Sequence, residues 1–84
     1  MFMHYLYIAK CRDNSLYIGI SNDPAQRVER HNRGQGSQWI RQHGEATLVY
    51  IERFDSYIGA HRRELQVKKW SRSKKENLIK GLKP

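Results

Sequence analysis

The sequence predicts an α+β fold in which helices flank a three-stranded antiparallel sheet. Three short runs rich in tyrosine and aliphatic residues have the composition of strands, at residues 2–11, 15–20 and 46–54. Segments with helix-capping signals follow the second and third runs, which predicts the order ββαβαα. Because chains of 84 residues rarely support two cores, we expect one domain spanning residues 1–84.

The connection between the first two predicted strands is a polar stretch suited to a hairpin turn. A three-residue loop at 12–14 needs its last residue in the left-handed conformation, which Asn14 tolerates. A loop of two or four residues would instead move one strand's side chains to the other face of the sheet.

The three-residue loop brings two tyrosines together. It pairs Tyr7 with Gly19 and Ala9 with Tyr17, so both phenols lie on one face, about 7–8 Å apart along the diagonal at the backbone. The small partners Gly19 and Ala9 would leave room for a ligand above the sheet. The alternative is that both tyrosines are core residues, since aromatic residues favour strands.

The first predicted helix has a strong start signal. Asp23 suits the N-cap, Pro24 suits the first helical position, and Gln26 can close a capping box. We expect this helix to end near Asn32, and the polar, glycine-bearing stretch 33–44 to be a loop.

The third predicted strand is followed by two helices. One is expected to begin after residues 55–56 and to continue to about Trp70. A capping box from Ser73 to Glu76 predicts the start of the last helix, which Gly81 and the terminal proline would end.

The first helix carries charge where a core-facing stripe is expected. Its best inward stripe contains Pro24, Arg27, Val28 and His31, and Val28 is its only sizeable apolar residue. On an isolated helix Arg27 and His31 would form a solvated face. No other apolar face exists, so we expect them to point toward the tyrosines.

The second helix carries Glu64 among cationic residues. Glu64 can form an exposed ion pair with Lys68 at i,i+4 spacing, worth a few tenths of a kcal/mol. Alternatively, its carboxylate can hold a divalent ion against phosphate. Mg²⁺ suits that arrangement because it keeps most of its waters and needs only one or two carboxylates.

A basic run follows, with Trp70 in its middle. An aromatic ring among cations suits a surface that tracks a nucleic-acid backbone, although Trp70 can equally pin the last helix to the core. The cations of this run are Lys68, Lys69, Arg72, Lys74 and Lys75.

The overall charge narrows the choice of partner. Sixteen Lys and Arg against eight Asp and Glu give a net charge of +8, which attracts phosphate backbones or anionic membranes. No apolar run approaches the ~20 residues of a membrane helix, and no signal peptide is visible, so we expect a cytoplasmic protein with no membrane partner. The single cysteine excludes an internal disulfide and a zinc site built on paired cysteines. The oligomeric state stays open, a monomer included.

Assembled in order, these motifs resemble the GIY-YIG nuclease superfamily, and above all its small single-domain bacterial members. The segments that carry the resemblance are Tyr5-Leu6-Tyr7, Tyr17-Ile18-Gly19, Arg27-x-x-x-His31, Arg63-Glu64, and Lys69-Trp70-Ser71-Arg72 with Lys74-Lys75. Tyr5 and Leu6 replace the glycine and isoleucine of the first motif, so that motif rests on Tyr7.

The resemblance implies hydrolysis of phosphodiester bonds, with Mg²⁺ or Mn²⁺ as cofactor. It implies that Tyr7 is the base or orients the attacking water, and that Tyr17 assists by hydrogen bonding. Arg27 would stabilise the phosphoryl charge, His31 would position groups or relay protons, and Glu64 would bind the metal. Since an unperturbed phenol has a pKa near 10, we expect Arg27 and the metal to favour the phenolate.

The expected substrate is DNA, including structured or branched DNA, and RNA is not excluded. The alternative function is a nucleic-acid-binding module that has the same fold and little or no catalytic activity.

Overall fold

A three-stranded antiparallel sheet forms the centre of the molecule. The computed structural model describes residues 3–34 and 38–84, with strands β1 (His4–Cys11), β2 (Leu16–Ser21) and β3 (Ala46–Phe54). Their order is β2-β1-β3, and β1 pairs antiparallel with both neighbours. The predicted sheet is confirmed, and β2 is one of its two edges.

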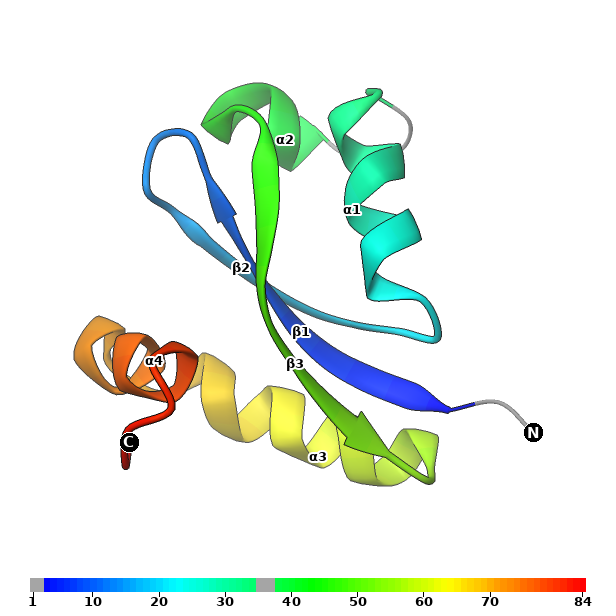
Figure 1. Cartoon of the computed structure of the whole chain (residues 1–84), viewed down its shortest axis with the longest axis vertical. Helices are drawn as coiled ribbons and strands as arrows, with labels where there is room; N and C mark the ends of the chain where they lie inside the picture. Colours follow the sequence, from blue (N-terminus) through cyan, green and yellow to red (C-terminus); the bar gives the residue numbers. More distant parts are fainter. Residues whose placement is uncertain (1–2, 35–37) are drawn as a thin grey trace.

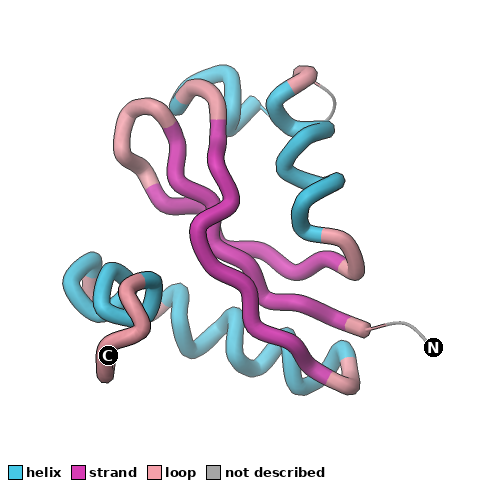
Figure 2. Tube along the Cα trace, viewed as in Figure 1, coloured by secondary structure: helices cyan, strands magenta, loops and turns pink. Residues whose placement is uncertain are grey.

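The helices cover both sides of this sheet (Figure 1). Their bounds are α1 Pro24–Asn32, α2 Gln38–His43, α3 Tyr57–Lys68 and α4 Arg72–Ile79. α1 and α2 lie on one side of the sheet, and α3 and α4 lie on the other. Figure 2 shows the same arrangement, with the helices as cyan tubes and the strands as magenta tubes. The α+β class and the order ββαβαα are therefore confirmed, with α2 as one additional short helix. Within residues 3–34 and 38–84, every helix is too short or too polar to cross a membrane.

The prediction of a loop at 33–44 missed α2, whose described backbone begins at Gln38. Its polar composition carries little helical periodicity, and tertiary contacts hold its end. The Nδ1 atom of His43 lies 2.6 Å from Asp13 Oδ2 and 3.1 Å from the hydroxyl of Ser15, both in the β1–β2 hairpin region.

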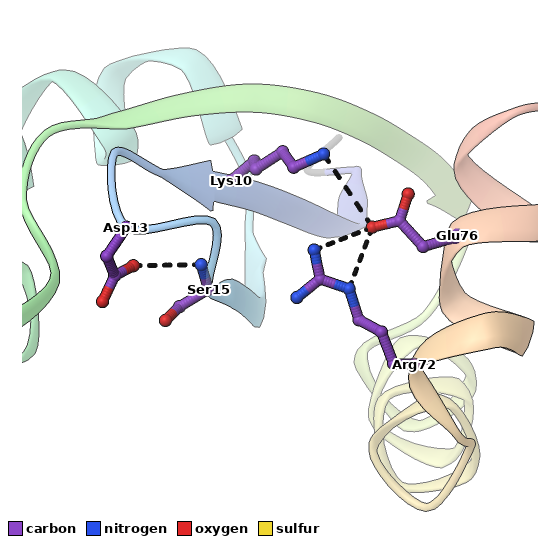
Figure 3. Close-up of polar contacts among 5 residues, drawn as sticks. All are labelled: Lys10, Asp13, Ser15, Arg72 and Glu76. Atoms are coloured by element: carbon purple, nitrogen blue, oxygen red, sulfur yellow. Dashed lines mark hydrogen bonds and ion pairs between the residues drawn. The ribbon is translucent and has the colours of Figure 1, made fainter.

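The predicted cap of the last helix was also wrong. Ser71, not Ser73, is the N-cap, and its side chain accepts a hydrogen bond from the backbone N–H of Lys74 at 3.3 Å. Glu76 does not complete a capping box, because the residue three positions after Ser71 is Lys74; the Glu76 carboxylate instead pairs with cations. It lies 2.9 Å from the Arg72 guanidinium and 3.9 Å from Lys10 Nζ on β1 (Figure 3).

The β1–β2 turn has the geometry that the sequence predicts. Asn14 has a φ of +76°, and its N–H donates to the carbonyl of Cys11 at 2.8 Å. The N–H of Cys11 donates to the carbonyl of Ser15 at 2.9 Å, and the N–H of Ser15 donates to Asp13 Oδ1 at 3.0 Å (Figure 3). This turn sets the pairing of the two strands.

The two faces of the sheet bury different sets of side chains. On the α1 side, one cluster consists of Tyr7, Ala9, Cys11, Val28 and Ala46. On the α3 side, the other consists of Leu6, Ile8, Ile18, Val67 and Leu78. Because side chains alternate along β1, its buried odd-numbered residues belong to the first cluster and its buried even-numbered ones to the second.

Trp70 pins the C-terminal helices to the core. It packs against the cluster on the α3 side, with the Arg63 guanidinium 5.1 Å and the Lys74 ammonium 5.9 Å from its ring centroid. Of the two readings of the basic run, this arrangement supports the packing role for Trp70.

The turn geometry predicts a stability difference between two substitutions. Asn14→Ala should lower the free energy of unfolding by about 1 kcal/mol, because alanine has no side-chain compensation for the left-handed conformation. Asn14→Gly should leave it within about 0.5 kcal/mol of the parent, since glycine adopts positive φ freely. Urea unfolding followed by circular dichroism measures both. Equal losses in the two variants would contradict this role for residue 14.

Candidate active site

Two tyrosines from neighbouring strands meet on the α1 side of the sheet. Tyr7 pairs with Gly19 and Ala9 with Tyr17, as the three-residue loop predicts. The ring centroids of Tyr7 and Tyr17 lie 6.1 Å apart with planes inclined by 38°. Tyr7 is 2% exposed, whereas Tyr17 is half-buried, so Tyr17 presents the larger surface to solvent.

Gly19 accommodates the ring of Tyr7. A Cβ atom on Gly19 would lie 2.8 Å from both Cζ and the hydroxyl oxygen of Tyr7, closer than side-chain atoms pack. The prediction that Gly19 leaves room for a ligand was therefore wrong at this position, because the phenol of Tyr7 itself fills that space.

Helix α1 adds a histidine and an arginine to the tyrosine pair. Pro24, Val28 and His31 form its buried stripe, and the rings of His31 and Tyr17 meet edge to face at 5.9 Å. Arg27 is largely exposed, yet it acts on Tyr7 through its charge and a hydrogen bond. Both predicted α1 residues thus belong to the cluster, His31 through packing and Arg27 through its guanidinium.

Burial and charge set the protonation states in this cluster. Burial, aided by the charge of Tyr17, raises the pKa of Tyr7 to about 12, although Arg27 lowers it in part. In the free protein, desolvation therefore raises the pKa of Tyr7 by more than Arg27 lowers it. Burial, with a smaller contribution from the charge of Arg27, lowers the pKa of His31 below 6.5. At pH 7 the cluster therefore contains a neutral phenol and a neutral imidazole.

Glu64 lies outside this cluster, on the helix that covers the other face of the sheet. Its side chain is 15% exposed, with Oε2 3.2 Å from Lys68 Nζ and Oε1 3.4 Å from His61 Nδ1. The ion pair between Glu64 and Lys68 therefore forms. Glu64 is spaced four and three residues from the buried Ala60 and Val67, which places it on the sheet-facing stripe of α3.

The chemistry of Glu64 is compatible with a Mg²⁺ or Mn²⁺ ion. No group of three or more His, Cys, Asp or Glu side chains able to hold a metal occurs within residues 3–34 and 38–84. A single, mostly buried carboxylate suits Mg²⁺, which takes its remaining ligands from water and substrate. The ammonium of Lys68 lies 3.2 Å from Oε2 of this carboxylate, which shows that the group can pair with a cation.

The predicted nucleic-acid-binding cations lie on α3, α4 and their junction. Those that are exposed are Lys68, Lys69, Arg72 and Lys74, and Lys75 is half-buried. Arg72 is engaged with Glu76 and Lys68 with Glu64. These cations are therefore on the same side of the sheet as Glu64, and the tyrosine cluster is on the other.

Two features of the candidate site and its surroundings were not predicted from the sequence. The exposed Arg30 and Arg33 extend the charge of Arg27 along α1, and their spacing of three residues was a usable signal. A half-buried network also joins β3 to α3: Tyr50 donates to Glu52 Oε2 at 2.5 Å, and Arg63 Nε lies 3.0 Å from Glu52 Oε1. That network has no sequence signal, because it depends on how α3 crosses β3.

Comparisons with known proteins extend over nearly the whole chain. The family model described as the GIY-YIG catalytic domain matches residues 3–77. A UPF0213 protein of Staphylococcus saprophyticus is 45% identical over 76 residues, which is 90% of this chain and 93% of that protein. A UPF0213 protein of Staphylococcus aureus is 44% identical over 77 residues, covering 92% and 94% of the two chains.

Two solved structures are similar in fold and sequence. The solution NMR structure of a UPF0213 protein from Bacillus halodurans has a TM-score of 0.61 and 40% identity, covering 93% of this chain and 83% of that one. That of a protein from E. faecalis has a TM-score of 0.64 and 31% identity, covering 94% and 84%.

The contact between Tyr7 and Gly19 predicts a coupled pair of substitutions. Gly19→Ala should lower the free energy of unfolding by about 1–3 kcal/mol, because the added methyl group collides with the buried phenol. In a Tyr7→Ala background the same change should cost much less, since the ring is absent. A double-mutant cycle by urea unfolding measures this coupling. Additive losses would show that the ring does not limit residue 19.

Proposed function

Because the chain belongs to the GIY-YIG family, we propose that it is a metal-dependent endonuclease that hydrolyses phosphodiester bonds in DNA. The observation that carries the proposal is the convergence of Tyr7, Tyr17, Arg27 and His31 on one face of the sheet. A domain that only bound nucleic acid would need exposed cations, and it would not need two phenols and an imidazole packed together beside a guanidinium.

We assign Tyr7 to orienting the attacking water rather than to removing its proton. With a pKa of about 12, ionising this phenol at pH 7 costs about 7 kcal/mol in the free protein. A neutral phenol can still donate one hydrogen bond and accept another, which is sufficient to hold a water molecule or a phosphate oxygen. Its burial fixes the hydroxyl in one position.

His31 is the better proton acceptor of the cluster. Its lowered pKa keeps the imidazole neutral at pH 7, and a neutral ring nitrogen can take the proton that the water loses when its oxygen attacks phosphorus. Tyr17, whose ring contacts His31, would assist by hydrogen bonding. The P–O bond to the leaving oxygen breaks in the same displacement, and that oxygen is finally protonated from solvent.

Arg27 would stabilise the phosphoryl group. Arg27 is exposed, so its guanidinium can meet a phosphate entering from solvent. A fixed charge at this point favours the transition state, where negative charge on the phosphoryl oxygens is least shielded.

Glu64 is the residue that would hold the metal. When bound there, Mg²⁺ or Mn²⁺ would supply Lewis-acid stabilisation of phosphate oxygens. Glu64 would then exchange its ion pair with Lys68 for the metal, and Lys68 would be free to contact the nucleic-acid backbone. The network of Tyr50, Glu52 and Arg63 would hold α3 in place beside β3 while this exchange occurs.

The alternative function is a nucleic-acid-binding module with little or no activity. The observation that favours it is that α3, the helix that carries Glu64, packs on the face of the sheet opposite the tyrosine cluster. The exposed cations on both sides would serve either function, and they accept DNA or RNA equally.

Two substitutions distinguish these functions. Tyr7→Phe and Glu64→Gln should each reduce cleavage at least about 100-fold, because they remove a positioned hydroxyl and the metal-binding charge. Binding measured by fluorescence anisotropy should change less than about threefold. The substrates are duplex, nicked, branched and single-stranded DNA, each with Mg²⁺ and with chelator.

Two further variants serve as matched controls for the same assay. Tyr5→Phe removes a phenol from the same strand and Glu45→Gln removes an exposed carboxylate, and neither should alter cleavage. If the parent protein binds these DNAs with a steep salt dependence and cuts none of them, the binding module is the correct function.

The protonation state of His31 predicts the acid side of the pH profile. As pH falls below 6.5 and then through the lowered pKa of His31, the imidazole gains a proton and can no longer accept one. The ratio kcat/KM should therefore fall toward low pH, with an apparent pKa below 6.5. His31→Gln should lower the rate and remove this limb. A limb that persists unchanged in His31→Gln would contradict the assignment, provided circular dichroism shows both proteins folded.

A further inference from the structure

A surface pocket lies apart from the tyrosine cluster, where β2 ends and α3 begins. Its volume is about 480 Å³, within the range of about 300–1,000 Å³ that is typical of small-molecule sites. The residues that line it are His4, Ile20, Ser21, Asn22 and Tyr57. Ile20 pairs with Leu6 of the cluster on the α3 side, so the pocket is on the same side of the sheet as Glu64.

Two rings form an aromatic corner in this pocket. The centroids of His4 and Tyr57 lie 5.9 Å apart and their planes are inclined by 77°. His61 supports Tyr57 from the next turn of α3, with centroids 5.7 Å apart and planes inclined by 10°. Tyr57 is nevertheless 55% exposed, an unusual position for a large aromatic side chain that contributes little to the core.

We propose that this pocket binds one nucleobase of the substrate, stacked in the aromatic corner. A planar base can stack on one ring while its edge meets the other, and stacking of this kind holds unpaired bases in many nucleic-acid-binding proteins. Ser21 and Asn22 provide hydroxyl and amide groups at the pocket wall that can hydrogen-bond to the edge of a base. This inference rests on the proposed function, because it requires nucleic acid to be the ligand.

The net charge of the chain favours a nucleotide over a neutral aromatic ligand. Tyr57 is the first residue of the twelve-residue helix α3, and no acidic residue lies in its first turn. The partial positive charge of a helix N-terminus attracts phosphate, and the chain as a whole carries a charge of +8. Asp23 and Asp55 lie close in the sequence to the lining residues Asn22 and Tyr57, so the attraction of a nucleotide's phosphates comes mainly from the net charge of the whole chain.

The pocket is also connected to the proposed metal ligand. His61, stacked on Tyr57, has its Nδ1 atom 3.4 Å from Glu64 Oε1. This Nδ1 atom is buried and makes no hydrogen bond. A nucleotide whose base stacks on Tyr57 would therefore lie about two helical turns, roughly 10 Å, along α3 from Glu64, so that a phosphate of the same strand could approach that carboxylate.

The test measures binding without cleavage. The backbone amides of ¹⁵N-labelled protein are followed by NMR, in chelator, during titration with hexathymidylate, with hexauridylate, and with a hexamer of abasic sugar-phosphates. We expect the amides of Ser21, Asn22 and Tyr57 to shift with the two base-bearing hexamers and not with the abasic one. The comparison of the first two probes shows whether the base can come from DNA, RNA or both.

Substitutions of Tyr57 provide the second measurement. Tyr57→Leu keeps apolar area and removes the aromatic face, so the Kd for hexathymidylate should rise about tenfold, a ratio equivalent to about 1.4 kcal/mol. Tyr57→Phe keeps the ring and should leave the Kd within about twofold. Because Tyr57 is exposed, both variants should fold, and their NMR spectra verify this.

The outcomes separate this proposal from the proposed function. Equal binding of the abasic hexamer, or an unchanged Kd in Tyr57→Leu, would overturn the base-binding pocket even if the protein cleaves DNA. If the shifts and the Tyr57 effects appear as expected in a protein that cuts no substrate, the pocket stands and the nuclease assignment fails.

Discussion

The register between β1 and β2 is the constraint on which the rest of the structure depends. It is set by one left-handed residue, Asn14, in a three-residue turn. Because strand side chains alternate, a slip of one residue would move Tyr7 or Tyr17 to the α3 side and place polar groups in the core. The same register puts Gly19 beneath the ring of Tyr7, where any larger residue would collide. The turn therefore determines both the packing and the composition of the candidate site.

The burial that organises this site also limits its chemistry. Tyr7 is among the largest fully buried side chains of the residues that the structure describes, and the desolvation that accompanies this raises its pKa to about 12. The same environment lowers the pKa of His31. Burial thus favours the neutral form of both groups, because it raises the pKa of the phenol and lowers the pKa of the imidazole. A fixed phenol and a neutral imidazole are a hydrogen-bonding group and a proton acceptor, so packing distributes the two roles between two residues.

Features that depend on local chemistry could be predicted from the sequence, whereas those that depend on how helices cross the sheet could not. The hairpin register, the N-cap at Asp23 and the sheet itself follow from turn, capping and strand preferences. Helix α2 has weak local signals and is held by the contacts of His43. The packing of α3, which carries Glu64, on the face opposite the tyrosines depends on the path of that helix across the sheet. The i,i+4 spacing of Tyr57 and His61 can be seen in the sequence. Only the three-dimensional structure shows that Tyr57 lines a pocket between β2 and α3.

α3, which carries Glu64, and the tyrosine cluster lie on opposite faces of the sheet, and the edge strand β2 borders both faces. A sheet interior blocks any direct contact between groups on its two faces, so a substrate that uses both must pass around an edge. β2 is such an edge, and it carries Tyr17 on one side and Ile20 of the aromatic pocket on the other. β3, the opposite edge, has α1 lying over it and carries neither group. If one phosphodiester is to meet Arg27 and Glu64 together, the strand must therefore cross the β2 edge, and a base held by Tyr57 would anchor it there.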